Sequence, residues 1–189
     1  MKFDVVLADP PWEFRVWSKK GSGRTASSHY PVMTTASLAH LPIQSVAEKN
    51  CALFLWAVWP NLPAALYIIQ SWGFVYRTVA WVWAKTTTDR KKWHMGMGYY
   101  SRANTEIALL AVKGRMPVVH RDVLALIVSP VGQHSAKPDI QYEKIERLYP
   151  GRKCLELFAC KARSGWSGLG NELDGEDIRD GLKRLEQGL

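Results

Sequence analysis

The chain has 189 residues, 47% hydrophobic and 22% charged, a balance that suits one globular domain with a sizeable core. Its formal net charge of +8 favours a polyanionic partner. No apolar run is long enough to span a membrane, and the chain enters an apolar strand at once instead of a signal peptide, so we expect no membrane association.

The cysteines and histidines point to neither a disulfide framework nor a metal site. Cys51, Cys154 and Cys160 lack Cys-x-x-Cys spacing, and we expect all three to be buried free thiols of an intracellular protein. The histidines are scattered, and none forms a ligand pair at helical spacing, so no metal is predicted.

The first predicted element is a buried parallel strand over residues 5–8, which ends directly at Asp9-Pro10-Pro11-Trp12. In open α/β sheets, ligands bind beyond the carboxyl ends of the strands. Both prolines lack a backbone donor and should leave their carbonyls free to accept, and Asp9 adds a carboxylate. This acceptor corner, beside the Trp12 ring, suits a planar group with an amino substituent and could direct the amine lone pair at an electrophile.

The next elements alternate between helices and strands. A basic loop over 13–30, with Lys19, Lys20 and Arg24, is either a solvated surface loop or a lid that contacts a nucleic-acid backbone. We then expect one helix from Thr34 or Thr35 to Glu48 and a strand over 51–59. A helix from Pro60 to Trp72 and a strand over 74–85 follow. This rhythm predicts a doubly wound, mostly parallel α/β sheet.

A second polar loop precedes the next pair of predicted strands. Lys91 and Lys92 stand beside Trp93, which fits a groove that tracks phosphates and stacks a base, although a solvated charged loop is the alternative. A polar block with Arg102 and Glu106 then enters a strand over 107–112. Residues 123–128 are expected to form a further strand.

The last third of the sequence has the pattern of a cofactor-binding unit. Lys137 lies in a polar loop, where it could either reach an anionic group or serve as a capping or solvent lysine. A helix over 139–148, a strand over 154–159 and a short strand over 165–172 follow, and Asp174 is expected to cap a final helix. Asn171 and Glu172, at the end of the short strand, are suited to bonding ribose hydroxyls, although the glycine fingerprint of dinucleotide sites is absent.

Asp9-Pro10-Pro11-Trp12 resembles the catalytic tetrad of the S-adenosylmethionine-dependent adenine-N6 methyltransferases. That family includes the catalytic subunit of the eukaryotic messenger-RNA adenosine methyltransferase and small bacterial and phage DNA adenine methyltransferases. Its members carry, in order, the tetrad, a Glu entering a late strand, a Ser-x-Lys-Pro-like loop, a Glu-Leu-Phe strand and a Gly-Asn-Gln/Glu ending. Here these motifs fall at 9–12, 106, 135–138, 156–158 and 170–172.

The resemblance implies a Rossmann-like class I methyltransferase with permuted motif order. Residues 1–189 would form a single methyltransferase domain, with a catalytic and substrate half (1–130) followed by a cofactor-binding half (131–189). The implied cofactor is S-adenosyl-L-methionine. The implied place of action is the cytoplasm, as a bacterial or phage-encoded protein.

The resemblance also implies roles for individual residues. Asp9 and Pro10 would hold the target amine, Trp12 would stack the base, Glu106 would position the target adenine, and Lys137 would pair with the cofactor carboxylate. The predicted catalytic residues are Asp9, Pro10, Pro11 and Trp12. The predicted cofactor-binding residues are Asp9, Lys137, Glu156, Phe158, Asn171 and Glu172. The predicted substrate-binding residues are Glu106, Lys19, Lys20, Arg24, Lys91, Lys92 and Arg102.

Two features depart from the family pattern. The messenger-RNA enzymes have an Arg and then His-Asn near the cofactor ribose, whereas residues 159–163 here read Ala-Cys-Lys-Ala-Arg, so Lys161 or Arg163 would have to substitute. Larger members also have an upstream segment against the cofactor adenine. Because this sequence begins shortly before Asp9, we expect Phe158, or residues near Asp122 and Val123, to close that pocket.

The sequence thus predicts methyl transfer to the N6 amine of adenine in DNA, single- or double-stranded, with a short or lax sequence preference. RNA adenine methylation is the alternative enzyme reading, since both substrates present the same base edge and phosphates. A catalytically inactive nucleic-acid-binding subunit is the alternative from a different class, and the intact tetrad argues against it. A nicotinamide-dependent oxidoreductase is disfavoured by the missing glycine fingerprint.

Overall fold

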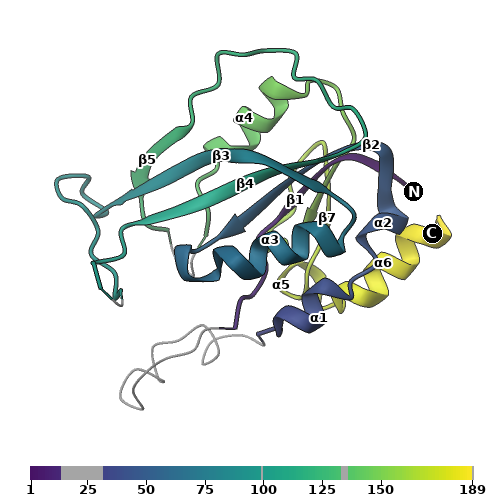
Figure 1. The fold of residues 1–189 in the computed structure, drawn as a ribbon, viewed down its shortest axis with the longest axis horizontal. Helices are drawn as coiled ribbons and strands as arrows, with labels where there is room; N and C mark the ends of the chain where they lie inside the picture. Colours follow the sequence, from purple (N-terminus) through teal and green to yellow (C-terminus); the bar gives the residue numbers. More distant parts are fainter. Residues whose placement is uncertain (14–31, 99, 133–135, 189) are drawn as a thin grey trace.

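The computed structural model describes residues 1–13, 32–98, 100–132 and 136–188, and these form one seven-stranded sheet with helices on both faces (Figure 1). The strand order is β5-β3-β4-β2-β1-β6-β7. The strands are β1 (Phe3–Ala8), β2 (Ala47–Ala57), β3 (Val75–Thr86), β4 (Thr105–Lys113), β5 (Leu126–Pro130), β6 (Cys154–Leu157) and β7 (Trp166–Leu169). The helices are α1 (Thr35–Ala39), α2 (Ile43–Val46), the 3-10 turn η3 (Trp59–Asn61), α3 (Leu62–Ser71), α4 (Ile140–Leu148), α5 (Asn171–Asp174) and α6 (Ile178–Gln187).

The strand directions bring the functional part of the chain to one edge of the sheet. β1 pairs in parallel with β2 and β6, β6 with β7, and β3 with β5, whereas β4 lies antiparallel between β2 and β3. The parallel strands therefore end at one edge, and β4 begins there with Thr105 and Glu106. β1 lies where the chain switches from one side of the sheet to the other, so Asp9 follows it at the switch point, where open α/β sheets bind ligands.

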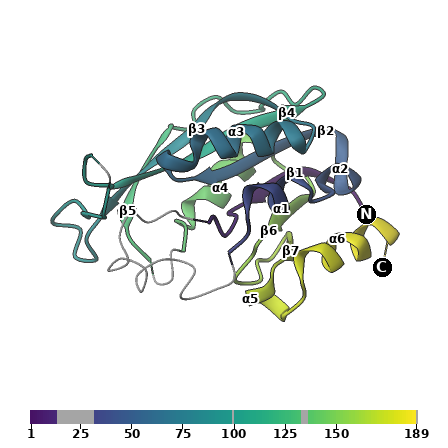
Figure 2. The same cartoon turned by 60° about the horizontal axis from the view of Figure 1, so that its bottom comes forward.

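Alternating side chains of the central strands pack into two hydrophobic cores. Phe3, Val6 and Ala8 of β1 face the core covered by α1, α2, α3 and α6, and Val5 and Leu7 face the core covered by α4. Because β1 is buried on both faces, its sequence is almost continuously apolar. Both chain termini lie together near α2 and α6 (Figure 2). The predicted doubly wound, mostly parallel α/β sheet is confirmed.

The prediction of one helix from Thr34 to Glu48 is wrong. The segment contains two short helices, α1 and α2, separated at Pro42, which has no backbone N–H to continue a helix and disfavours helical geometry in the residue before it. Thr34 does cap α1, because its side chain accepts a hydrogen bond from the Ser37 N–H at 3.1 Å. β2 then begins at Ala47, which pairs with Phe3.

Other boundaries also differ from the predictions, among them those of β2, which spans 47–57 instead of 51–59, and of β6, which ends at Leu157 instead of residue 159. β5 begins at Leu126, the first residue that pairs with β3, instead of at the predicted residue 123. The predicted strand over 165–172 ends at Leu169, and Asn171 already belongs to α5. Asp174 is the last residue of α5, and Asp177 caps the final helix by accepting from the Arg179 N–H at 2.8 Å.

Two of the three cysteines are buried as predicted. Cys51 and Cys154 lie in the cores, but Cys160 is exposed because it follows β6 at the open edge of the sheet. Within the described ranges, no helix has the length and apolar character needed to cross a membrane.

Candidate active site

A cavity of about 460 Å³ opens at the carboxyl edge of the sheet, beyond β1, β6 and β7. It collects residues from both ends of the chain. The predicted site residues in its wall are Asp9, Pro10, Pro11, Trp12, Glu106, Lys137, Phe158, Asn171 and Glu172. A volume of this size lies within the range of small-molecule sites.

The Asp-Pro-Pro-Trp corner is held by its own backbone. The Pro10 carbonyl accepts from the Trp12 N–H at 2.8 Å, and the Pro11 carbonyl accepts from the Met33 N–H at 2.9 Å. The prediction that both carbonyls are free to accept is therefore wrong. Each oxygen has a second lone pair, so both can still accept a further hydrogen bond. The internal bonds make the corner stiffer than the two fixed φ angles alone would.

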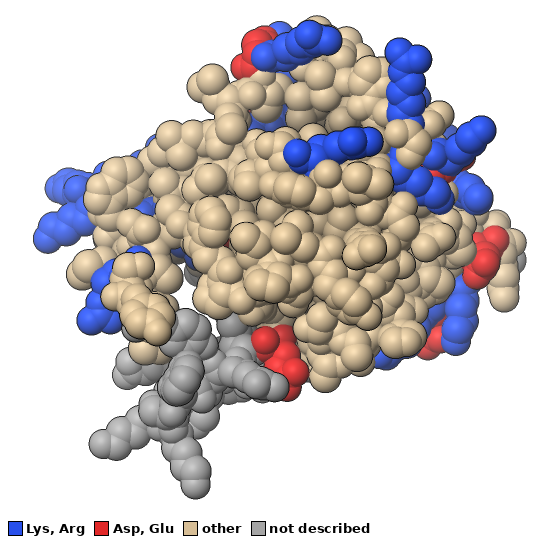
Figure 3. Space-filling view, in the orientation of Figure 1, with Lys and Arg blue, Asp and Glu red and all other residues tan. Residues whose placement is uncertain are grey.

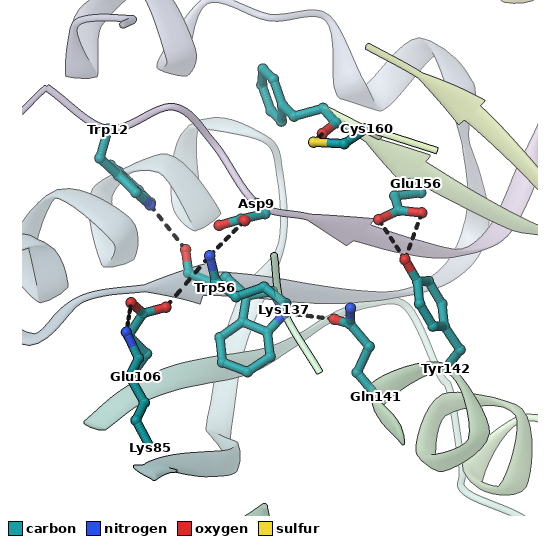
Figure 4. A network of polar contacts seen from close by, with 11 residues as sticks. Asp9, Trp12, Trp56, Lys85, Glu106, Lys137, Gln141, Tyr142, Glu156 and Cys160 are labelled. Atoms are coloured by element: carbon teal, nitrogen blue, oxygen red, sulfur yellow. Dashed lines mark hydrogen bonds and ion pairs between the residues drawn. The ribbon is translucent and has the colours of Figure 1, made fainter. Parts of the chain in front are cut away.

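Trp12 belongs to the core as well as to the cavity wall. Its side chain is only 5% exposed, and the indole N–H donates to the carbonyl of Trp56 at 3.1 Å. The Trp56 indole N–H in turn donates to Gln141 at 2.7 Å, which links the corner to α4 across the sheet (Figure 4). These bonds fix the orientation of Trp12, because a buried indole N–H requires an acceptor.

Two carboxylates and two ammonium groups alternate behind the corner (Figure 4). Lys137 lies 2.6 Å from Asp9 and 3.4 Å from Glu106, and Lys85 pairs with Glu106 from the other side. Glu106 is 8% exposed, whereas about one third of the Asp9 side chain is accessible from the cavity. Lys85 was not predicted as a site residue, because nothing local in a strand-end lysine marks it as a partner of Glu106.

Burial and the lysines act in opposite directions on the titration of this group. Burial raises the pKa of Asp9 above its ordinary value, although Lys137 opposes that shift. Burial also acts to raise the pKa of Glu106, but Lys137 and Lys85 together outweigh it and hold that pKa below its ordinary value. The two carboxylates raise the pKa of Lys137 against the effect of its burial. Glu106 and Lys137 therefore stay charged at neutral pH.

The opposite wall of the cavity comes from the last third of the chain. Phe158 follows β6, and Asn171 and Glu172 begin α5 immediately after β7. Phe158 has φ +63°, a left-handed conformation that is rare for a bulky side chain and is associated with functional sites.

Glu156 lies away from the cavity wall. Its two carboxylate oxygens accept from the Tyr142 hydroxyl at 2.9 and 3.1 Å, which ties β6 to α4. Burial raises the pKa of Glu156 to about 7, although Tyr142 opposes the shift. The structure therefore gives this predicted cofactor-binding residue a contact with α4 instead of a place in the wall.

The residues proposed to replace the family's missing Arg and His also lie elsewhere. Lys161 pairs with Asp139 at 2.8 Å, and the guanidinium of Arg163 lies 4.1 Å from the centre of the Tyr142 ring. Cys160 and Arg179 are in the cavity wall instead. Arg179 was not predicted as a site residue, because a helix cap at Asp174 would place it in the second turn of the last helix.

The expectation that Phe158, or residues near Asp122 and Val123, closes the pocket of the cofactor adenine stays a prediction. Phe158 lines the cavity, whereas Asp122 lies on the surface, paired with Arg147 at 2.6 Å. Ile178 and Arg179, at the start of α6, also line the cavity.

The predicted nucleic-acid contacts fall partly within the described residues. Lys91, Lys92 and Arg102 are exposed on the connection between β3 and β4, where Lys and Arg side chains gather at the left of Figure 3. Trp93 in the same connection is 58% exposed. The remaining predicted contacts, Lys19, Lys20 and Arg24, lie outside the described residues. In the part of the chain that is described, no group of three or more His, Cys, Asp or Glu residues is arranged to hold a metal ion.

A doubly wound sheet with an Asp-Pro-Pro-Trp corner at its switch point is the arrangement that the resemblance to Rossmann-like methyltransferases implies. Comparison with known families agrees: the MT-A70 profile matches residues 3–172, and the chain belongs to the MT-A70 family. The membership in the adenine-N6 methyltransferase family that the motifs predicted is thereby confirmed.

Curated relatives match almost the whole chain but differ in how much of their own length is covered. The Type II methyltransferase M.MunI of Mycoplasma sp is 30% identical over 94% of this chain and 80% of its own length. The human N(6)-adenosine-methyltransferase catalytic subunit METTL3 is 31% identical over 95% of this chain but 30% of its own length. The N(6)-adenosine-methyltransferase MT-A70-like protein of Arabidopsis thaliana is 31% identical over 96% of this chain and 25% of its own length.

Proposed function

We propose that this methyltransferase transfers a methyl group from S-adenosylmethionine to the N6 amine of adenine in DNA. The observation that carries the proposal is the joining, in one cavity, of the acceptor corner at Asp9 and Pro10 with the polar wall at Asn171 and Glu172. In this reading residues 1–130 supply the substrate side of the cavity and residues 131–189 supply the cofactor side. An intracellular location is part of the same proposal.

The residues of the cavity fit S-adenosylmethionine. Asn171 and Glu172 offer the amide and carboxylate groups that bond ribose hydroxyls, and Phe158 offers an apolar surface for a ring. Asp9 and Lys137 offer one charge of each sign for an amino-acid group. When bound, S-adenosylmethionine supplies a methyl group made electrophilic by the adjoining sulfonium.

The chain's own residues would prepare the adenine amine for attack. Lys137 bonds Oδ2 of Asp9, and we assign the other carboxylate oxygen and the Pro10 carbonyl to the two hydrogens of the amine. The lone pair of the amine, otherwise delocalised into the ring, then points away from the corner and towards the incoming methyl group. After transfer the nitrogen carries an extra proton, which Asp9 accepts and passes to solvent through its accessible side.

The base must leave a stacked duplex to reach Asp9, unless the substrate is single-stranded. The exposed Lys91, Lys92, Trp93 and Arg102 supply phosphate and stacking contacts beside the site. The preference for DNA rests on the similarity to the Type II methyltransferase M.MunI, which is 30% identical over 94% of this chain.

The test is label transfer from S-adenosylmethionine to duplex DNA, single-stranded DNA and RNA in separate reactions, with an Asp9→Ala variant in parallel. Label recovered as N6-methyladenine from DNA, and lost in the variant, is the expected result. Label recovered only from RNA would replace the DNA assignment with the second candidate, which the similarity to METTL3 favours. Nucleic-acid binding without transfer to any substrate would indicate a catalytically inactive subunit.

A further inference from the structure

Lys85 holds Glu106 from the side that faces away from the cavity. It stands at the carboxyl end of β3, next to the start of β4, and its backbone N–H donates to the carbonyl of Asn104 at 2.9 Å. Its ammonium group pairs with Glu106 Oε1 and lies 4.7 Å from the centre of the Trp83 ring (Figure 4). Glu106 forms part of the cavity wall, but Lys85 does not.

Lys137 is shared between two carboxylates. It reaches Oδ2 of Asp9 at 2.6 Å and Oε2 of Glu106 at 3.4 Å, and its side chain is 10% exposed. A buried carboxylate that loses its counter-ion is strongly disfavoured. Because Lys85 already occupies Oε1, Glu106 retains a cation when Lys137 changes partner, whereas without Lys85 its ion pairs among the described residues would reduce to the one with Lys137.

We propose that Lys85 is a positioning residue that neutralises Glu106 and so allows Lys137 to pair with the carboxylate of the methionine part of the cofactor. The inference rests on the proposed function, since that carboxylate belongs to S-adenosylmethionine. The Lys85 side chain is 17% exposed and its ammonium group points at Glu106, so its role is exerted through that carboxylate. Any effect of Lys85 on cofactor binding should therefore depend on the charge of residue 106.

The test measures the binding of two ligands by titration calorimetry or competition. S-adenosylhomocysteine carries the amino-acid carboxylate, and 5′-methylthioadenosine lacks it. In Lys85→Met the dissociation constant for S-adenosylhomocysteine should rise about tenfold, the size of one lost charge-assisted hydrogen bond, while that for 5′-methylthioadenosine stays unchanged. Lys85→Arg should bind both ligands as the parent protein does.

A double variant separates positioning from structural damage. Glu106→Gln removes the charge that Lys85 neutralises, so Lys85→Met combined with Glu106→Gln should recover most of the lost affinity for S-adenosylhomocysteine. Lys49→Met removes an exposed positive charge at the far end of β2 and serves as the matched control, with no expected change. Thermal unfolding of each variant checks that it is folded.

Three results would overturn the inference. One is equal affinity of Lys85→Met and the parent protein for S-adenosylhomocysteine. Another is a folded Lys85→Met variant that loses as much affinity for 5′-methylthioadenosine as for S-adenosylhomocysteine, which would indicate general damage to the cavity. The third is weaker DNA binding with unchanged ligand binding, which would make Lys85 a phosphate contact. If the parent protein binds neither ligand, the proposed function fails as well, so the two failures can be told apart.

Discussion

Lys137 Nζ lies 2.6 Å from Oδ2 of Asp9, and this ion pair joins residues 128 positions apart in the chain. Asp9 follows β1, and Lys137 comes from the segment between β5 and α4, so the contact forms only when the strands end at a common edge. The same ammonium group approaches Glu106, which makes Lys137 the centre of the charged group behind the cavity.

Replacing Asp9 by Asn should abolish most of the methyl transfer while the protein stays folded. The amide keeps the size of the side chain but loses the charge and one acceptor, so we expect a rate loss of at least ~100-fold, typical of a lost electrostatic contact at a reacting centre. Lys137 keeps Glu106 as a partner, so the free energy of unfolding should change by only about 1–2 kcal/mol. Initial rates and urea unfolding measure the two effects, and an unchanged rate would remove Asp9 from the reaction.

Glu156 should make the protein less stable as the pH rises from about 5 to 7.5. Its pKa is raised from 4.5 to about 7 in the folded state, so between these values the folded protein binds a proton that the unfolded chain has released. Stability therefore falls with increasing pH, by at most about 3 kcal/mol for this group. Urea unfolding across this range is the measurement.

The matched variant for that experiment is Glu156→Gln. It does not titrate, and its amide oxygen can still accept from the Tyr142 hydroxyl. The variant should show a flatter dependence of stability on pH than the parent protein. Parallel curves for the two proteins would mean that Glu156 does not titrate in this window.

Trp12→Phe should destabilise the fold by about 2–3 kcal/mol. The substitution leaves the buried carbonyl of Trp56 without the indole donor and reduces the volume of a side chain that is 5% exposed. Trp93→Phe, at a 58% exposed position, is the control and should change the free energy of unfolding by less than about 0.5 kcal/mol. Equal effects of the two substitutions in urea unfolding would contradict the structural role given to Trp12.

The paired substitution of Lys91 and Lys92 by Gln should weaken DNA binding and flatten its dependence on salt. Each phosphate contact contributes about 0.7–0.9 to the slope of log K against log salt concentration, so the slope should decrease by up to about 2. Lys49 and Lys153, both exposed at the amino edge of the sheet, are replaced by Gln in the control protein. If the control loses as much affinity, binding depends on overall charge and not on the β3–β4 connection.

The acceptor corner could be predicted because its signals are local. An apolar run that stops at Asp9 and two prolines predicts a buried strand and a stiff turn without reference to the rest of the chain, and both are present. The alternation of strands and helices likewise predicted the doubly wound sheet. Boundaries were less accurate where a single residue decides them, as at Pro42 and at Asp177.

Contacts between distant segments could not be predicted in the same way. The placement of β4 antiparallel between β2 and β3 brings Glu106 next to Lys85 and Lys137, and strand order depends on packing throughout the sheet. The same holds for Glu156, whose partner Tyr142 comes from α4, and for Arg179, which reaches the cavity because α6 packs on the sheet.

The sequence by itself determined most of the elements, the type of sheet and the residue types of the corner, since these follow from residue order and backbone geometry. Only the tertiary structure decided which charges neutralise one another behind that corner. An ammonium group binds the carboxylates that lie nearest after folding. For Lys137 these are Asp9 and Glu106, which follow β1 and begin β4, far away in the chain.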